Sequence, residues 1–134
     1  MFKSLLNNQV RNIDLALLFL RLFGGGMMLT HGYPKLKKVL AGDFGFGDPI
    51  GIGPEASLFL TMFAEFFCAI ALVVGFKSRL ASIPLMIAML VAGLIHHGDD
   101  PFRRQEFPLL YFAIYLAIFL VGSGKYSIDG QSSK

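Results

Sequence analysis

Four apolar stretches, each close to the length of a membrane-spanning helix, constrain the fold of this chain most. They cover residues 13–31, 56–76, 79–97 and 106–122. Because a helix rises about 1.5 Å per residue, about 20 residues cross the roughly 30 Å hydrocarbon core of a bilayer. A water-soluble bundle of these helices would expose Leu, Ile, Met and Phe, since the third stretch has no polar face and the fourth has almost none. We therefore predict an all-α fold, an integral membrane four-helix bundle.

The composition agrees with a single membrane domain over residues 1–134. Hydrophobic residues make up 54% of the chain and charged residues only 16%, and the mean hydropathy is +0.61. These values exclude a disordered chain, a collagen-like repeat and a disulfide scaffold. The net charge is +3, but the basic residues stand in twos and threes between apolar runs and form no stripe interleaved with aromatic residues. We expect the lipid bilayer as the surroundings and no nucleic-acid partner.

A single cysteine, Cys68, limits the redox chemistry that the chain can perform alone. It has no second thiol with which to form an intramolecular disulfide. If the protein takes part in electron transfer, the electrons therefore pass through a bound cofactor or a partner protein.

The first stretch is interpreted as a mature helix and not as a cleaved signal peptide. Arg21 interrupts its apolar run, and no A-x-A-like cleavage site follows. Four spans place both termini on one side of the membrane. Lys and Arg divide almost evenly between the two sides, whereas most loop acids lie on the side away from the termini. This small asymmetry favours termini in the cytoplasm.

Two ionisable residues, Arg21 and Glu65, lie inside the predicted spans. A charged group within the membrane is costly unless it is paired or faces water. Counted from the ends of antiparallel spans, the two residues differ in depth by only about 4 Å, so we expect an Arg21–Glu65 ion pair inside the bundle. The pair is either a packing device or the floor of a polar pocket. Thr61 and Cys68 share a helix face with Glu65 and would line such a pocket.

Several polar residues gather near the ends of the spans on one face of the membrane. They are His31, Lys35, His96, His97 and Glu106. Adjacent helical residues such as His96 and His97 point about 100° apart and rarely ligate one ion, so we predict no metal site. Imidazole, ammonium and phenol groups instead suit a small polar molecule or a quinone head group. Tyr111, one turn from Tyr115, either faces this cavity or anchors the fourth helix at the interface.

The segment between the first two spans, residues 41–56, is rich in Gly and Pro. It includes the run GFGDPIG, but a phosphate-binding glycine motif needs a preceding strand, and here a membrane helix precedes it. We predict a surface loop or a short re-entrant cap.

Short motifs follow one another in order along nearly the whole chain. They are Arg21 in the first span, HGYPKL at residues 31–36, Glu65 in the second span, GFKSR at 75–79, Glu106 opening the fourth span and the tail GSGKYSID at 122–129. Together they resemble the DoxX family of small four-helix membrane proteins. The resemblance implies a compact multi-pass bundle in the bacterial inner membrane.

The resemblance also implies a functional context. The family is related to the membrane subunit of thiosulfate:quinone oxidoreductase, and other members are linked to oxidative-stress complexes with superoxide dismutase and a sulfurtransferase. We expect a membrane subunit of a quinone-linked oxidoreductase, related to thiosulfate or other sulfur compounds or to oxidative stress, with quinone as the suspected cofactor and a soluble redox partner protein. The expected quinone-binding residues are Arg21, His31, Lys35, His97 and Tyr111, and the expected catalytic, proton-handling residues are Glu65 and Glu106.

Two alternatives to the redox hypothesis stay open on the sequence. The chain is a non-enzymatic membrane accessory or scaffold protein of a redox complex, or it is a small transporter that functions as a homo-oligomer. The interior of the bundle distinguishes a scaffold from a quinone protein. A scaffold predicts a filled and dry interior, whereas a quinone site predicts a pocket that opens toward lipid.

Overall fold

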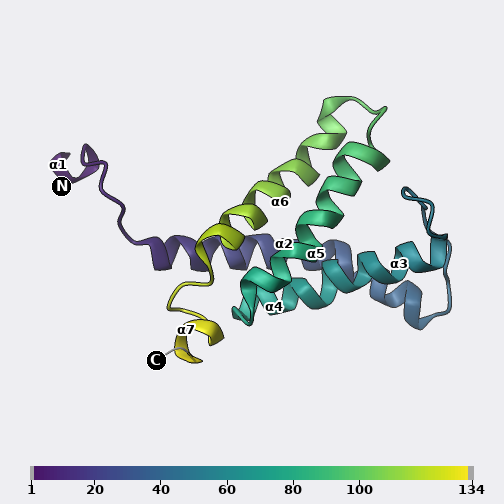
Figure 1. Ribbon diagram of the computed structural model, residues 1–134, viewed down its shortest axis with the longest axis horizontal. Helices are drawn as coiled ribbons and strands as arrows, with labels where there is room; N and C mark the ends of the chain where they lie inside the picture. Colours follow the sequence, from purple (N-terminus) through teal and green to yellow (C-terminus); the bar gives the residue numbers. More distant parts are fainter. Residues whose placement is uncertain (1, 133–134) are drawn as a thin grey trace.

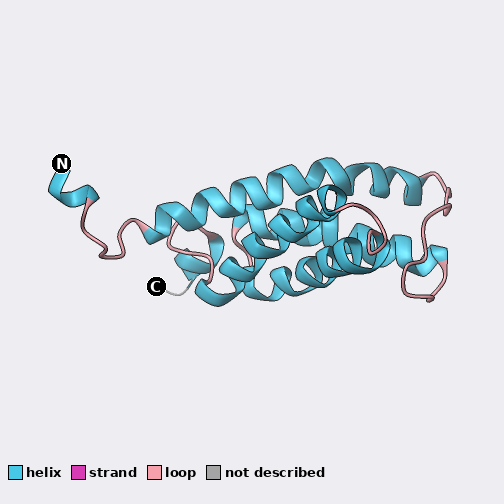
Figure 2. Ribbon diagram, turned by 90° about the horizontal axis from the view of Figure 1, so that it is seen from above, coloured by secondary structure: helices cyan, strands magenta, loops and turns pink. Residues whose placement is uncertain are grey.

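The computed structural model describes residues 2–132, which form helices joined by loops, with no strand among them (Figures 1 and 2). Some helices contain π-helical segments, here labelled η. The elements in chain order are α1 (Phe2–Leu5), α2 (Ile13–Leu40), α3 (Pro54–Met62), η1 (Phe63–Cys68), α4 (Ala69–Val74), α5 (Ser78–Leu90), η2 (Val91–His96), α6 (Phe102–Val121) and α7 (Ile128–Ser132).

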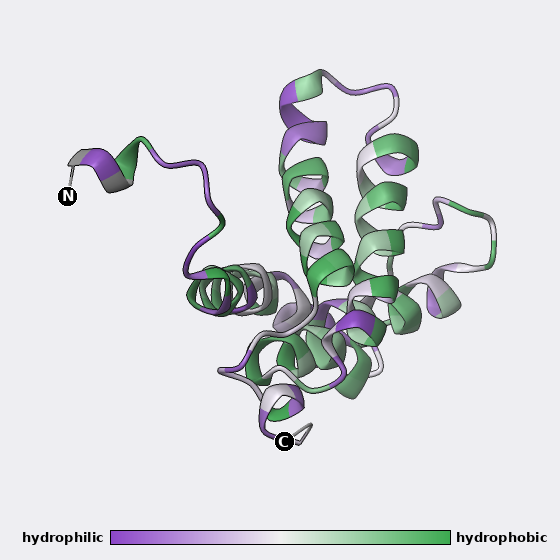
Figure 3. Ribbon diagram, turned by 60° about the vertical axis from the view of Figure 1, so that its left-hand side comes forward, coloured by the Kyte–Doolittle hydropathy of each residue, from purple (hydrophilic) through white to green (hydrophobic). Residues whose placement is uncertain are grey.

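Four continuous helices are long and apolar enough to cross a membrane. They are Ile13–Leu40, Pro54–Val74, Ser78–His96 and Phe102–Val121. The predicted all-α membrane bundle is therefore confirmed, and Figure 3 shows apolar residues along these helices with polar residues gathered mainly toward the ends and connections. The first helix runs to Leu40, past the residue 31 where the apolar stretch was expected to end. With 28 residues it is about 42 Å long.

The four membrane helices form two hairpins, α2 with α3–η1–α4 and α5–η2 with α6. The two hairpins are inclined to each other, so that a wedge-shaped space lies between them. In Figure 1, α2 and the continuous α3–η1–α4 helix run antiparallel in one layer, and the α5–α6 hairpin rises away from them. The hairpins pack together near the chain termini and diverge toward the opposite end of the bundle. The shared core contains Met28, Leu72, Leu85, Tyr115 and Ile118, all at most 1% exposed.

Glycines on one face of α2 let it approach the neighbouring helices closely. An added Cβ at Gly25 would lie 2.7 Å from the carbonyl oxygen of Ala69, and one at Gly32 would overlap the carbonyl of Glu65. Small residues at such positions are typical of packed membrane helices. They fix the register of α2 against η1, with Gly32 at the level of Glu65.

Arg21 does not pair with Glu65, so the expected ion pair is wrong. Its guanidinium is buried and donates to four backbone carbonyls: Leu72 (3.1 Å) and Val73 (3.3 Å) at the end of α4, and Ser123 (2.7 Å) and Tyr126 (2.8 Å) in the tail. The cause is register. Because Gly32 packs against Glu65, that carboxylate lies about 16 Å along α2 from Arg21. The guanidinium instead meets carbonyls at a helix C-terminus, where cations are favoured.

The C-terminal tail closes the same end of the bundle. Asp129 accepts hydrogen bonds from the backbone N–H groups of Lys77 (2.7 Å) and Ser78 (3.0 Å), at the start of α5. Asp14 accepts one from the N–H of Lys125 (3.0 Å). Arg21 therefore pairs with free backbone carbonyls at the end of α4. Asp129 pairs with free backbone N–H groups at the beginning of α5, across the tight turn between the two helices.

Candidate functional site

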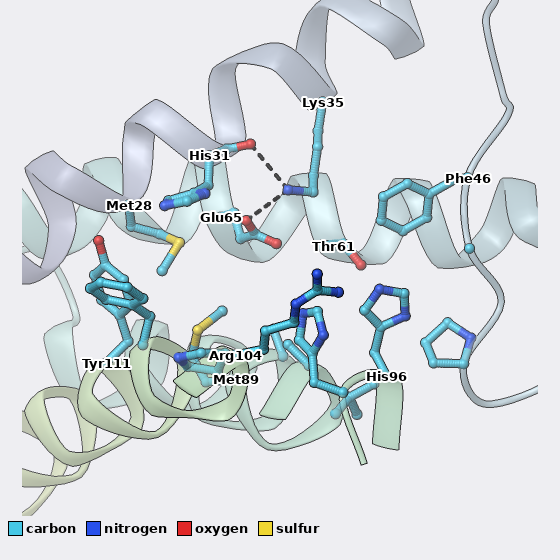
Figure 4. A pocket seen from close by; sticks show the side chains of 18 residues that line it. Met28, His31, Lys35, Phe46, Thr61, Glu65, Met89, His96, Arg104 and Tyr111 are labelled. Carbon is cyan, nitrogen blue, oxygen red and sulfur yellow. Dashed lines mark hydrogen bonds and ion pairs between the residues drawn. The ribbon is translucent and has the colours of Figure 1, made fainter. Parts of the chain in front are cut away.

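The wedge between the two hairpins encloses a cavity of about 440 Å³. It lies at the end of the bundle where the hairpins diverge, away from Arg21 and the tail. Figure 4 shows side chains from both hairpins and from the loop after α2 pointing into it. Its polar lining residues are His31, Lys35, Thr61, Glu65, His96, His97, Arg104 and Tyr111, and its apolar walls include Met28, Phe46, Met89, Phe107 and Pro108. The interior of the bundle is therefore not filled at this end.

An ion pair between Lys35 and Glu65 forms one wall of the cavity. Lys35 Nζ lies 2.9 Å from Glu65 Oε1, and the two side chains are 20% and 7% exposed. Lys35 Nζ also donates to the carbonyl of His31 at 3.1 Å (Figure 4). The HGYPK motif explains this arrangement. His31 and Lys35 are four residues apart on one helix face, and Gly32 between them brings α2 against the backbone of Glu65.

Both π-helical segments carry polar residues of the cavity. Glu65 lies in η1 and His96 lies in η2. A π-helical turn inserts an extra residue and shifts which side chains face inward, and such turns are frequent at functional sites. The apolar pattern of the sequence does not reveal them, because most of the residues in and around both segments are hydrophobic.

Two tyrosines on α6 have different roles. Tyr111 lines the cavity, and its ring meets that of His31 edge-on with 6.1 Å between centroids. Tyr115 stacks on Tyr111 but is fully buried, and its hydroxyl donates to the carbonyl of Gly24 at 2.8 Å. Tyr111 therefore faces the cavity, whereas Tyr115 joins α6 to α2.

The outer end of the cavity carries a second polar cluster. His97 Nδ1 lies 2.7 Å from Asp100 Oδ2, and Arg104 approaches the same carboxylate at 4.0 Å. The hydrogen bond with His97 holds the pKa of Asp100 below its usual value against the opposing effect of desolvation, and the charge of Arg104 acts in the same direction. Asp100 is therefore ionised at neutral pH and fixes His97 at the mouth.

The loop after α2 covers part of the cavity. Phe46, Gly47 and Pro49 line it. Asp48 holds the loop by accepting hydrogen bonds from the N–H groups of Ile52 (2.9 Å) and Gly53 (3.0 Å) and from the hydroxyl of Ser57 (3.1 Å). The expected surface loop is thus also a cap over the site.

The structure brings five of the predicted site residues to the cavity: His31, Lys35, Glu65, His97 and Tyr111. Arg21 lies at the other end of the bundle, and Glu106 is exposed outside the cavity, as helix α6 turns it away. Cys68 is buried in the core and does not line the site. Arg104 also lines the cavity, one helical turn before Pro108 on the same face of α6, although no motif in the sequence marks it as a site residue. Among residues 2–132, no three His, Cys, Asp or Glu side chains gather as a metal site.

Comparison with known proteins agrees with this architecture. The family model described as DoxX matches residues 16–98, which is more than half of the chain and includes most of α2, the second membrane helix and α5 with η2. No curated protein and no solved structure matches. The matched region carries His31, Lys35 and Glu65 and most of the other residues that form the cavity. The chain belongs to the DoxX family.

Proposed function

We propose that this protein is the membrane subunit of a quinone-linked oxidoreductase, and that the cavity between the hairpins is its quinone site. The observation that carries this proposal is the Lys35–Glu65 pair at the wall of an otherwise largely apolar cavity within a membrane bundle. A buried carboxylate beside hydrogen-bond donors in a cleft is typical of a functional site.

The cavity suits a quinone in size and chemistry. Its volume of about 440 Å³ falls within the roughly 300–1,000 Å³ of small-molecule sites, which combine apolar walls with a few placed polar groups. Met28 and Met89 offer apolar contact to a ring. Lys35, His31 and Tyr111 supply N–H and O–H groups that can donate to carbonyl oxygens.

Each polar residue has a distinct role in the proposal. A bound quinone supplies the redox chemistry, since its reduction takes up two electrons and two protons. Lys35 places a positive charge next to the site and favours negative charge on a ligand oxygen. Tyr111 and His31 orient the head group by hydrogen bonding, and Glu65 holds and releases protons within an apolar surrounding. His97, fixed by Asp100, connects the mouth of the cavity with water.

Electrons reach the site from outside the chain. Cys68 is the one cysteine of the sequence and is buried away from the cavity, so it offers no thiol relay. The family relationship points to a sulfur compound such as thiosulfate, or to a component of the oxidative-stress response, as the source. A soluble redox partner protein would deliver the electrons at the open end of the bundle.

The proposal is tested by purifying the protein in mild detergent with native lipid and analysing bound small molecules by mass spectrometry. We expect near-stoichiometric quinone in the unmodified protein. Glu65→Gln should lower the quinone content, because it removes the charge that positions Lys35. Glu55→Gln, an exposed carboxylate on the same membrane helix, is the matched control and should leave the content unchanged. Lipid alone in every sample would overturn the proposal and favour the accessory role.

A further inference from the structure

We propose that the hydrocarbon tail of the ligand lies between α2 and α6, where the cavity opens sideways to the lipid. This inference rests on the proposed quinone site. It specifies the substrate class as a tail-bearing compound dissolved in the bilayer, and not a water-soluble ring compound.

The two helices meet at one point and separate beyond it. At Gly24 an added Cβ would lie 2.8 Å from Ile114, and the Gly24 carbonyl accepts the hydrogen bond of Tyr115. From this contact toward the loop end of the bundle, α6 rises away from α2 (Figure 1). His31 and Tyr111 are the next facing pair, and their ring centroids are 6.1 Å apart. We call the space from this pair to the end of the wedge the α2–α6 opening.

The residues at this opening belong both to the cavity and to the outer surface. His31 is exposed although it lines the cavity. Phe107 also lines it and is 69% exposed. On the surface beside them, Leu110 is 54% exposed and Met27 is 54% exposed. In a bilayer these apolar side chains face lipid, so the opening joins the cavity to the hydrocarbon core.

The opposite side of the wedge is covered. The loop after α2 packs against α3 through Phe44, whose ring stacks on Phe59 at 5.7 Å. It also reaches η2, where an added Cβ at Gly47 would lie 3.6 Å from His96 Cε1. Figures 1 and 3 show this loop beside α3 and α5, with no described segment of residues 2–132 crossing between α2 and the first half of α6. The α2–α6 opening is therefore the unsealed side.

The chemistry at the inner wall of the cavity and at the α2–α6 opening indicates the class of ligand. The inner end offers the Lys35–Glu65 pair and the Tyr111 hydroxyl to a polar head group. At the α2–α6 opening, the exposed side chains of Phe107 and Leu110 offer apolar contact on the side that faces lipid. A head group with carbonyl oxygens and a flexible hydrocarbon tail suits both ends, since the tail remains in hydrocarbon and the carbonyl oxygens meet hydrogen-bond donors at the inner wall.

The absence of tryptophan from the sequence allows a direct test. Phe107→Trp places a unique fluorophore at the opening, and because Phe107 is largely exposed the substitution should not disturb folding. Leu120→Trp is the matched control, on the same helix and 65% exposed but at the opposite end of the bundle. Both variants are reconstituted in lipid nanodiscs and titrated with a decyl-tailed benzoquinone, once with a bromine on the tail and once without.

We expect saturable loss of emission at Phe107→Trp that is larger with the brominated tail, and no such difference at Leu120→Trp. The amount of quinone retained by each variant is measured in parallel. If quinone is retained but bromine has no added effect at Phe107→Trp, the tail lies elsewhere and this inference fails while the quinone site stands. If neither variant retains quinone, the proposed function itself fails.

Discussion

Each charged residue inside the bundle is stabilised by a different kind of partner. Within residues 2–132, the hydrogen bonds of Arg21 go to backbone carbonyls, whereas the Glu65 carboxylate is paired with the ammonium of Lys35. A planar guanidinium has five N–H donors and can satisfy several carbonyls at once, but an ammonium acts as a compact charge beside a carboxylate. The first arrangement holds the fold together, and the second leaves a charged pair at the wall of a cavity.

Removing the guanidinium of Arg21 should destabilise the end of the bundle without emptying the site. Hydrogen bonds to charged groups contribute about 1.5–3 kcal/mol each, so we expect Arg21→Met to lower the free energy of unfolding by about 3 kcal/mol or more. Thermal unfolding in detergent measures the loss, and Arg103→Met, on an exposed residue, is the control. Equal stability of the two variants would contradict the role assigned to Arg21.

The Lys35–Glu65 pair should behave differently from the surface pair Lys38–Asp43. The second pair has a similar separation of 3.1 Å, but its side chains are 35% and 61% exposed. Exposed pairs contribute about 0–1 kcal/mol, whereas an unpaired charge left in a buried site costs more, here about 2 kcal/mol or more. Thermal unfolding should show a clear loss for Lys35→Met and little for Lys38→Met.

A second substitution checks this explanation. Neutralising the remaining carboxylate with Glu65→Gln in the Lys35→Met background should restore part of the lost stability, because no unpaired charge then remains. If the double variant is less stable than Lys35→Met alone, burial of an uncompensated charge is not the cause of the loss.

At the scale of helices, close approach of α2 to η1 sets the geometry of the site. Gly32→Ala would drive a methyl group into the Glu65 carbonyl, and overpacking of this kind costs about 1–3 kcal/mol. We expect lower thermal stability and a lower quinone content, because His31 and Lys35 move with α2. Gly26→Ala in the same helix has open space around it and should be neutral or slightly stabilising. Equal losses in both variants would contradict overpacking against Glu65 as the cause, because Gly26 has open space around it.

The start of α5 depends on a carboxylate from the tail. Burial raises the pKa of Asp129, but hydrogen bonds from Ser123 and from the N–H groups of Ser78 and Lys77, together with the charge of Arg21, hold it below its usual value. A lowered pKa in the folded state stabilises the protein above the unfolded pKa of about 3.9, and this contribution disappears as the pH falls through the folded pKa.

Asp129→Asn should therefore be less stable than the unmodified protein at neutral pH, and the difference should shrink below about pH 4. Thermal unfolding in detergent from neutral pH to below pH 4 measures this difference in stability. Asp99→Asn, on an exposed residue, should follow the unmodified protein at every pH. A difference for Asp129→Asn that stays constant down to low pH would rule out ionisation of Asp129 as its origin.

At the scale of the whole molecule, apolar length and order of the spans predict the four-helix membrane fold well. Because the third apolar stretch has no polar face and the fourth has almost none, the sequence favours a membrane bundle over a water-soluble one. The spacing of His31 and Lys35 predicts that they share a helix face. The register of α2 against the second membrane helix is not predictable in this way, because it depends on the contact of Gly32 with the backbone of Glu65. The expected Arg21–Glu65 pair is wrong for this reason. The end of α2 at Leu40 likewise depends on packing beyond the apolar stretch. The two π-helical segments and the wedge between hairpins likewise arise from tertiary contacts, so Arg104 and the covering loop could not be assigned to the cavity.

Because the cavity lies at one end of the bundle, its mouth faces one side of the membrane. The residues that line the cavity lie at the end of the bundle away from the tail, and Figure 1 shows α7 beside the turn between α4 and α5, opposite the loop that joins α2 to α3. Lys38 and Arg103 lie at the cavity end, and Lys125 lies at the end with the termini. If the termini are cytoplasmic, as the distribution of loop acids favours, the mouth faces the outer side of the membrane. An electron-donating partner would then have to act on that side.

Single cysteines test this orientation in intact bacterial cells. We expect a membrane-impermeant maleimide to label Lys38→Cys and Arg103→Cys but not Lys125→Cys, which should react only after the cells are permeabilised. The unmodified protein serves as the blank, because its one cysteine, Cys68, is buried. The reverse pattern would place the cavity in the cytoplasm and direct the search for a partner there. Labelling of all three sites in intact cells would contradict an arrangement in which both loops at the cavity end lie opposite the tail.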